Sequence, residues 1–171
     1  MRPNPFFKAF FAVVFALFGA WMATACVGNK VFDKYDQLPV EGWEKNDTLS
    51  FSVPPVSKDG LYDLGIGLRT TGEYPFMSLA LILETHVIPT DSLRLSLFPA
   101  VKTSYKKSCP LVNQRGYAEG QGVSLYQYNF HVATVRLQAG DSVLVHIRHD
   151  MKREMLPGIR DLGIALVRNG R

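Results

Sequence analysis

Cysteine and concentrated charge are both scarce in this sequence, and each absence excludes a class of protein. The two cysteines, Cys26 and Cys109, cannot supply the multiple disulfides that hold many small secreted domains together. The formal charge is only +4, and the short basic clusters at 106–107 and 152–153 form no continuous stripe. Because nucleic-acid binders neutralise several phosphates with clustered Lys and Arg, we do not expect nucleic acid as a partner.

Sequence motifs for catalysis are also lacking. The chain contains no G-x-S-x-G, H-E-x-x-H or P-loop pattern. His146 and His149 would lie on opposite faces of a strand, so they would not converge on one metal ion. Acidic residues are scattered, and Cys109 has no histidine near it in sequence, so neither a glycosidase pair nor a cysteine nucleophile can be named. We therefore predict no enzymatic activity, no cofactor and no metal site.

No persuasive amphipathic helix follows the N-terminal segment; short β-rich runs bounded by Pro, Gly, Asp and Asn take its place. Leu49, Phe51 and Val53, for example, alternate with polar residues, which is typical of a half-buried strand. The pattern predicts an all-β fold, an antiparallel β-sandwich that is jelly-roll-like. The expected strands are 48–54, 61–69, 78–88, 93–97, 123–128, 130–137, 142–148 and 162–167, with a short helical turn at 151–155.

The N-terminus carries the one long apolar run. Residues 9–25, AFFAVVFALFGAWMATA, contain no charged side chain and follow a short basic start with Arg2 and Lys8. A spanning helix needs about 20 apolar residues, and a basic cluster that would stop transfer is lacking here. We predict that residues 1–25 are a cleaved signal peptide, whose removal lowers the formal charge from +4 to +2.

The end of this segment resembles a lipobox. Ala23, Thr24 and Ala25 place three small side chains immediately before Cys26. The cysteine favours a lipoprotein in which diacylglycerol and an N-acyl chain such as palmitate are attached to Cys26. Secretion without lipid and an uncleaved anchor are the alternatives. On the favoured interpretation, residues 26–46 form a lipidated N-terminus and linker, and 47–171 form a single β-sandwich domain.

Lipidation of Cys26 would leave Cys109 without an intramolecular partner. Cys109 lies in a polar stretch, 102–122, where we expect a loop thiol. A disulfide to another molecule is the alternative.

Several segments resemble one known family. The C-terminal segment 149–164, HDMKREMLPGIRDLGI, closely resembles the signature of the gliding-motility lipoprotein GldH family. Other segments agree with the family in order, and the lipobox stands where the family has one. The resemblance covers most of residues 26–168, except that 99–114 matches no firm pattern. The segments that carry it are Trp43, 47–51, 62–69, 74–76, 116–126 and 149–164.

The resemblance implies a non-catalytic lipoprotein of the Bacteroidetes cell envelope, required for gliding and linked to type IX secretion. Its partners would be the membrane, through the lipid, and other envelope or gliding proteins. Residues 27–33, just after Cys26, contain no dense acidic cluster of the kind that resembles a surface-export signal in such bacteria. We therefore expect the protein on the periplasmic face of the outer membrane.

The signature can determine the fold, form a partner surface, or do both. Pro157 and Gly158 would reverse the chain, and Asp161 would accept backbone N–H bonds or pair with Arg153 or Arg160. Loops with several charged groups beside a rigid sheet often bind partners. The candidate partner-surface residues are Arg153, Leu156, Pro157, Gly158 and Asp161.

A carbohydrate-binding β-sandwich on a lipid anchor is the alternative function. It would require a flat, exposed row of three aromatic rings on which sugars stack. The aromatic residues considered for this row are Trp43, Tyr62, Tyr74, Phe76, Tyr117, Tyr126 and Tyr128.

Overall fold

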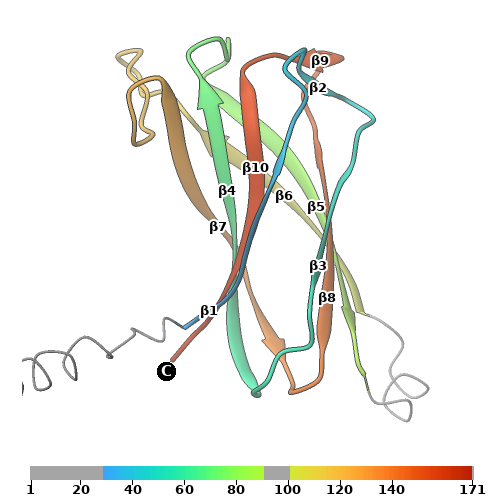
Figure 1. The fold of residues 1–171 in the computed structure, drawn as a ribbon. Coiled ribbons are helices and arrows are strands. Elements are labelled where there is room, and N and C mark those ends of the chain that lie inside the picture. The colour runs from blue at the N-terminus through green and yellow to red at the C-terminus, as the bar shows by residue number, and fades with distance from the viewer. Residues whose placement is uncertain (1–28, 91–100, 171) are drawn as a thin grey trace, which may run out of the picture.

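Two four-stranded antiparallel sheets form the body of the protein. The computed structural model describes residues 29–90 and 101–170, and within them every regular element is a strand. One sheet has the order β1-β10-β4-β7 and the other β3-β8-β5-β6, with a short β2-β9 ribbon at one end (Figure 1). The all-β antiparallel prediction is confirmed. The strands are β1 Lys30–Gln37, β2 Trp43–Glu44, β3 Leu49–Val53, β4 Gly60–Thr71, β5 Ser78–Ile88, β6 Val101–Pro110, β7 Leu125–Leu137, β8 Ser142–His149, β9 Met155–Leu156 and β10 Ile159–Arg168.

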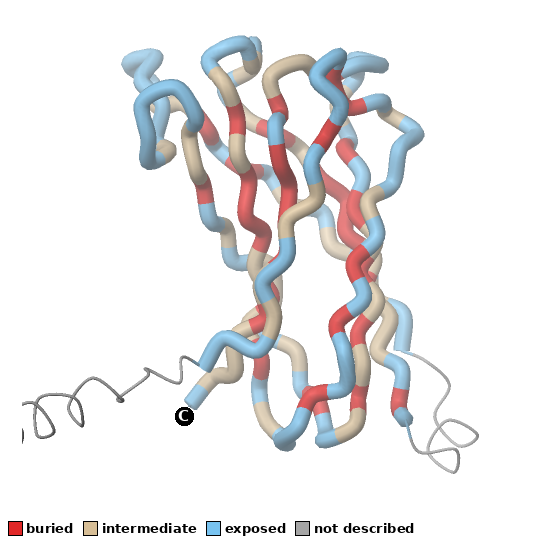
Figure 2. Tube along the Cα trace, viewed as in Figure 1, coloured by how far each residue is buried: buried red, intermediate tan, exposed pale blue. Residues whose placement is uncertain are grey.

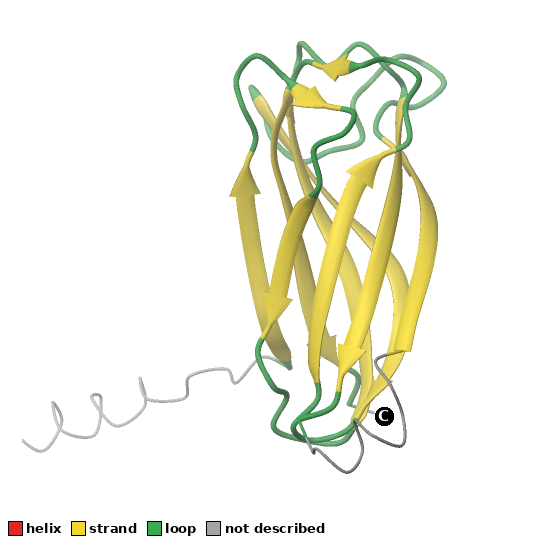
Figure 3. Ribbon diagram, turned by 90° about the vertical axis from the view of Figure 1, so that its right-hand side faces the viewer, coloured by secondary structure: helices red, strands yellow, loops and turns green. Residues whose placement is uncertain are grey.

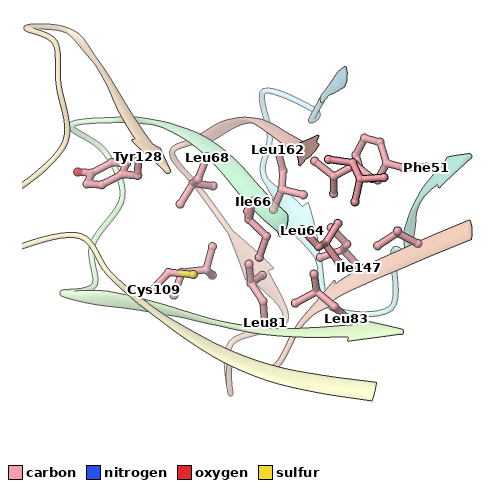
Figure 4. Close-up of a cluster of buried hydrophobic side chains, with 14 of the residues drawn as sticks. Phe51, Leu64, Ile66, Leu68, Leu81, Leu83, Cys109, Tyr128, Ile147 and Leu162 are labelled. Carbon is pink, nitrogen blue, oxygen red and sulfur yellow. The ribbon is translucent and has the colours of Figure 1, made fainter. Parts of the chain in front are cut away.

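The core lies between the two sheets. Alternate residues of β4, β8 and β10 point inward, and Figure 2 shows these buried positions recurring along the strands. Leu64, Ile66 and Leu68 from one sheet meet Leu81 and Leu83 from the other (Figure 4). Side chains of this size each contribute about 1.5–3 kcal/mol when fully buried. The alternation recognised in the sequence therefore corresponds to the face that folding removes from water.

Cys109 is part of this core. It lies on β6, opposite Leu79 of β5, and its side chain is fully buried. Burial raises the pKa of its thiol to about 11. The expected loop position is wrong, and a buried, protonated thiol gives no support to a disulfide with another molecule.

The sandwich begins earlier than residue 47. Residues Lys30–Gln37 pair with β10 as an edge strand, β1, so part of the expected 26–46 linker belongs to the first sheet. The expected strands 123–128 and 130–137 are one strand, β7, and residues 151–155 form no helical turn. The expected strand 93–97 lies outside the described residues.

The strand connections divide between two ends of the sandwich. The end at which the described chain begins and finishes, here called the entry end, holds Asn29, Gly170 and the turns at 54–59 and 138–141 (Figures 1 and 3). At this end Arg168 N–H donates to the Asn29 carbonyl over 2.7 Å. The opposite, far end holds the connections 38–48, 72–77, 111–124 and 150–158. The segment 149–158 of the family-like signature therefore lies at the end most distant from the N-terminus.

Candidate functional site

The β2-β9 ribbon closes the far end of the core. Trp43 pairs with Leu156, and both side chains are fully buried. The Trp43 indole N–H donates to the Asp47 carbonyl over 3.1 Å. Lys45 N–H donates to the Glu154 carbonyl over 2.8 Å, which extends the ribbon by one contact. The signature and the segment around Trp43, distant in sequence, thus form one cap.

The turn after β9 requires glycine. Gly158 has φ +78°, a left-handed conformation that L side chains rarely adopt, and a Cβ there would lie 2.3 Å from the Tyr74 nitrogen. Its carbonyl accepts a hydrogen bond from Thr71 N–H over 2.8 Å. The predicted chain reversal at Pro157 and Gly158 is thus coupled to the β4-β5 connection.

Asp161 has an ion-pair partner other than the two expected arginines, Arg153 and Arg160. It is 6% exposed, and its carboxylate lies 3.8 Å from the guanidinium of Arg69 on β4. The reason is register, because Asp161 and Arg69 are cross-strand neighbours in the β10-β4 pair.

The five candidate surface residues separate by burial. Leu156 and Asp161 are buried, Pro157 and Gly158 are half-buried, and Arg153 is exposed. The signature therefore determines the fold at four of these positions and offers a charged group to solvent at the fifth. Their role toward a partner stays a prediction.

The far end also exposes apolar side chains, of which the sequence singled out only Tyr117. Six large hydrophobic residues are exposed on its connections or at the adjacent strand termini. A hollow of about 520 Å³ lies between Phe76 and the segment 150–153. The exposed residues are Val40, Met77, Tyr117, Val123, Leu125 and Met155.

The two histidines of β8 point to opposite faces, as predicted. His146 accompanies His86 on the outer face and shares a hydrogen bond with the Ser50 hydroxyl over 2.8 Å. His149 is fully buried against Trp43, with ring centroids 5.2 Å apart. Desolvation lowers the pKa of His149 below its usual value. Among the described residues, no group of three or more potential ligands could hold a metal ion.

The buried histidine predicts a pH dependence of stability. Above pH 6.5 His149 is neutral in both folded and unfolded chains. As the pH falls below about 6.5 the unfolded chain binds the proton first, so stability decreases, by no more than about 1.4 kcal/mol per pH unit for one group. Urea unfolding at pH 8 and pH 5 should show a smaller loss in His149→Phe than in the native chain. Equal losses in the two proteins would contradict the assignment.

The aromatic residues do not form the row that the carbohydrate alternative requires. Trp43, Tyr62 and Tyr128 are buried, and three others are half-buried. Only Tyr117 is an exposed ring within this set. Stacking on a flat aromatic platform is thus not supported by the described part of the chain.

The lipidation candidate, Cys26, and the signal segment 1–25 lie outside the described residues. The first described residue, Asn29, follows Cys26 by three positions. Within the two described ranges, 29–90 and 101–170, no helix is long and apolar enough to cross a bilayer.

A family model and two curated relatives point to the same family. The family model described as "GldH lipoprotein" matches residues 30–166. A gliding motility lipoprotein GldH homolog from Christiangramia forsetii is 26% identical over 77 residues, which cover 45% of this chain and 46% of that protein. Gliding motility lipoprotein GldH from Flavobacterium johnsoniae is 31% identical over 67 residues, covering 39% of this chain and 42% of the relative. The chain thus spans less than half the length of either curated relative.

Similar solved structures are more distant. A protein from Sulfurospirillum deleyianum aligns over 82% of this chain and 99% of its own, with a TM-score of 0.47 and 9% identity. The Eiger TNF structure from S. frugiperda aligns over 81% and 92%, with a TM-score of 0.32 and 13% identity.

Proposed function

Because this chain belongs to the GldH lipoprotein family, whose model covers residues 30–166, we propose that it is a non-catalytic component of the gliding motility machinery. In this role it is held in the cell envelope by lipid, is linked to type IX secretion, and acts by binding protein partners. Family membership is the observation that carries the proposal. Its two curated relatives are both named as gliding motility lipoproteins.

The anchor in this proposal is Cys26. Its thiol receives diacylglycerol before residues 1–25 are removed, its new amino group is acylated afterwards, and the lipid is embedded in the periplasmic face of the outer membrane. The small residues at 23–25 support cleavage at this point. Three acyl chains, at about 0.8 kcal/mol for each buried CH₂, would make the attachment effectively permanent.

The anchor would orient the body. Asn29 follows Cys26 by three positions, a spacing that spans at most about 11 Å, so the entry end would lie against the membrane. The 12 residues of β4, at about 3.3 Å each, would carry the far end about 40 Å away from it. The segment 149–158 of the family-like signature would thus face the periplasmic space.

The strand order supports the jelly-roll description. In the first sheet, the first and last long strands, β1 and β10, are neighbours, followed by β4 and β7. In the second sheet, β3 neighbours β8, followed by β5 and β6. Successive strands mostly alternate between the sheets, as in two interleaved Greek keys.

The far end is the proposed partner surface. It combines the exposed charges Lys152 and Arg153 with the exposed apolar side chains Met77 and Met155. A centre that buries apolar groups inside a polar rim is the usual composition of a protein interface.

Charge reversal at this surface should separate binding from folding. We expect Lys152→Glu with Arg153→Glu to reduce the yield of partners crosslinked to the lipidated protein at least tenfold, because reversed rim charges oppose association. The matched control is Lys58→Glu with Arg136→Glu, two exposed changes near the entry end. Circular dichroism should show both variants folded.

The role itself is tested in the host cell. Deletion should impair spreading or secretion, and the native chain should restore it while the far-end double variant should not. A deletion that alters neither motility, secretion nor envelope integrity would refute the proposed role.

A further inference from the structure

A trough crosses the outer face of the β1-β10-β4-β7 sheet. Small residues lie on this face of the two central strands: Gly65 and Gly67 on β4, and Gly163 and Ala165 on β10. All of them except Gly163 line the trough. Register places Gly67 beside Gly163 and Gly65 beside Ala165, so the small residues form one block. With side chains missing there, the edge strands form walls around a hollow of about 410 Å³, which is within the roughly 300–1,000 Å³ range of small-molecule sites.

One end wall of the trough is preorganised. The Tyr35 ring lies across the glycines, since a Cβ at Gly67 would meet its hydroxyl oxygen. The Arg69 guanidinium sits 4.3 Å from the Tyr35 ring centroid and donates through Nε to the Gln127 side-chain oxygen over 2.8 Å. Gln127 in turn donates to the Tyr35 hydroxyl over 2.6 Å. Groups held by one another in this way lose less entropy when a ligand binds.

The remaining lining is mixed, because Ile66, Phe130 and Val167 also contribute, and its charged groups carry no excess of either sign. Lys30 and Arg69 are balanced by Asp33 and Asp63 among the lining residues. Lys30 and Asp33 also form an ion pair of 2.7 Å. Asn129 and His131 of β7 complete the side opposite β1. Because the charges balance, the lining favours neither an anion nor a cation as the ligand. Its side chains offer both hydrogen-bond donors and acceptors, most of them on planar groups.

We propose that this trough binds a neutral oligosaccharide. A sugar presents hydroxyl groups that both donate and accept, which matches amide, guanidinium, carboxylate and imidazole groups fixed around a shallow floor. Tyr35 covers Gly67 and Gly163. The floor beside it, at Gly65 and Ala165, allows a sugar ring to approach the sheet backbone closely. This site is independent of the far-end partner surface and uses polar contacts in place of the aromatic stacking considered from the sequence.

Enlarging Ala165, a floor residue, tests the proposal without removing a side-chain hydrogen bond. The lipidated chain, in a detergent without sugar groups, would be screened against gluco-, manno- and N-acetylglucosamine oligosaccharides, and hits measured by calorimetry. Ala165→Leu should weaken binding at least tenfold. Ser104→Leu, the same kind of enlargement on the outer face of the opposite sheet, should leave it unchanged.

Three results would overturn the proposal: no oligosaccharide binding at millimolar concentration, equal binding by Ala165→Leu and the native chain, or Ala165-dependent binding of peptides with none of sugars. Asn129→Ala, a change at an exposed wall position, gives a second reading and should also weaken binding. None of these outcomes bears on the gliding role, which the host-cell experiment tests separately.

Discussion

Serine at position 26 is expected to abolish lipid attachment completely. The hydroxyl of Cys26→Ser cannot form the thioether that holds diacylglycerol, so labelling by an alkynyl palmitate analogue should disappear. The label reports the anchor directly, because each buried CH₂ of the acyl chains contributes about 0.8 kcal/mol to anchoring. In-gel fluorescence of labelled cells would measure the effect.

The second cysteine provides the control. Cys109 is fully buried on β6, so Cys109→Ser should keep the full label on any chain that folds. Label that survives Cys26→Ser would refute the anchor, and so would a native mature chain found freely soluble with an unmodified Cys26.

Alanine at Gly158 should strongly destabilise the fold. The left-handed φ of +78° costs an L residue about 1–2 kcal/mol. A Cβ would in addition lie 2.3 Å from the Tyr74 nitrogen and 2.8 Å from the Glu73 carbonyl carbon, so the β4-β5 connection would have to move. We expect the free energy of unfolding to fall by about 3 kcal/mol or more, measured by urea titration.

Two other glycines separate the cost of the left-handed φ from the cost of the contact that a Cβ would make. Gly116 has φ +85° with nothing within 4 Å of a Cβ, whereas Gly72 also has open space around a Cβ but no positive φ. Gly116→Ala should therefore cost only the conformational 1–2 kcal/mol or so, and Gly72→Ala close to nothing. A Gly158→Ala effect no larger than that of Gly116→Ala would show that the contact with the β4-β5 connection carries little energy.

The sequence was sufficient to locate strands in which apolar and polar residues alternate regularly. Leu64, Ile66 and Leu68 lie within the expected strand 61–69 and mark the inner face of β4. The β4-β7 register shifts after Leu64, and Tyr35 lies over Gly67 on the outer face. Strands whose two faces differ in polarity could thus be located without structural information.

Edge strands were harder to predict, for a physical reason. In β1 a register shift between Lys30 and Phe32 breaks the alternation, and no residue of the strand is fully buried. On β6, inward-facing Cys109 follows a mostly polar run, so the segment looked like a loop. A strand that pairs on one side only needs few apolar residues and leaves a weak pattern.

Contacts between distant strands could not be predicted at all. Asp161 meets Arg69, and Gly163 lies beside Gly67, only because β10 pairs with β4 in one particular register. Shifting that register by one residue would move every side chain to the other face. The cap, the ion pair and the trough all depend on this choice, which a single sequence does not contain.

The position of Gly170, the last described residue, has a practical consequence for labelling. Gly170 lies beside Asn29, with a Cβ at Gly170 only 3.3 Å from the Asn29 side-chain nitrogen. With the lipid anchor that we propose at Cys26, a fluorescent protein or epitope attached close to Gly170 would be crowded between the body and the lipid headgroups. An epitope inserted beside Gly116, in an exposed connection at the other pole, would project away from the bilayer and remain open to antibodies.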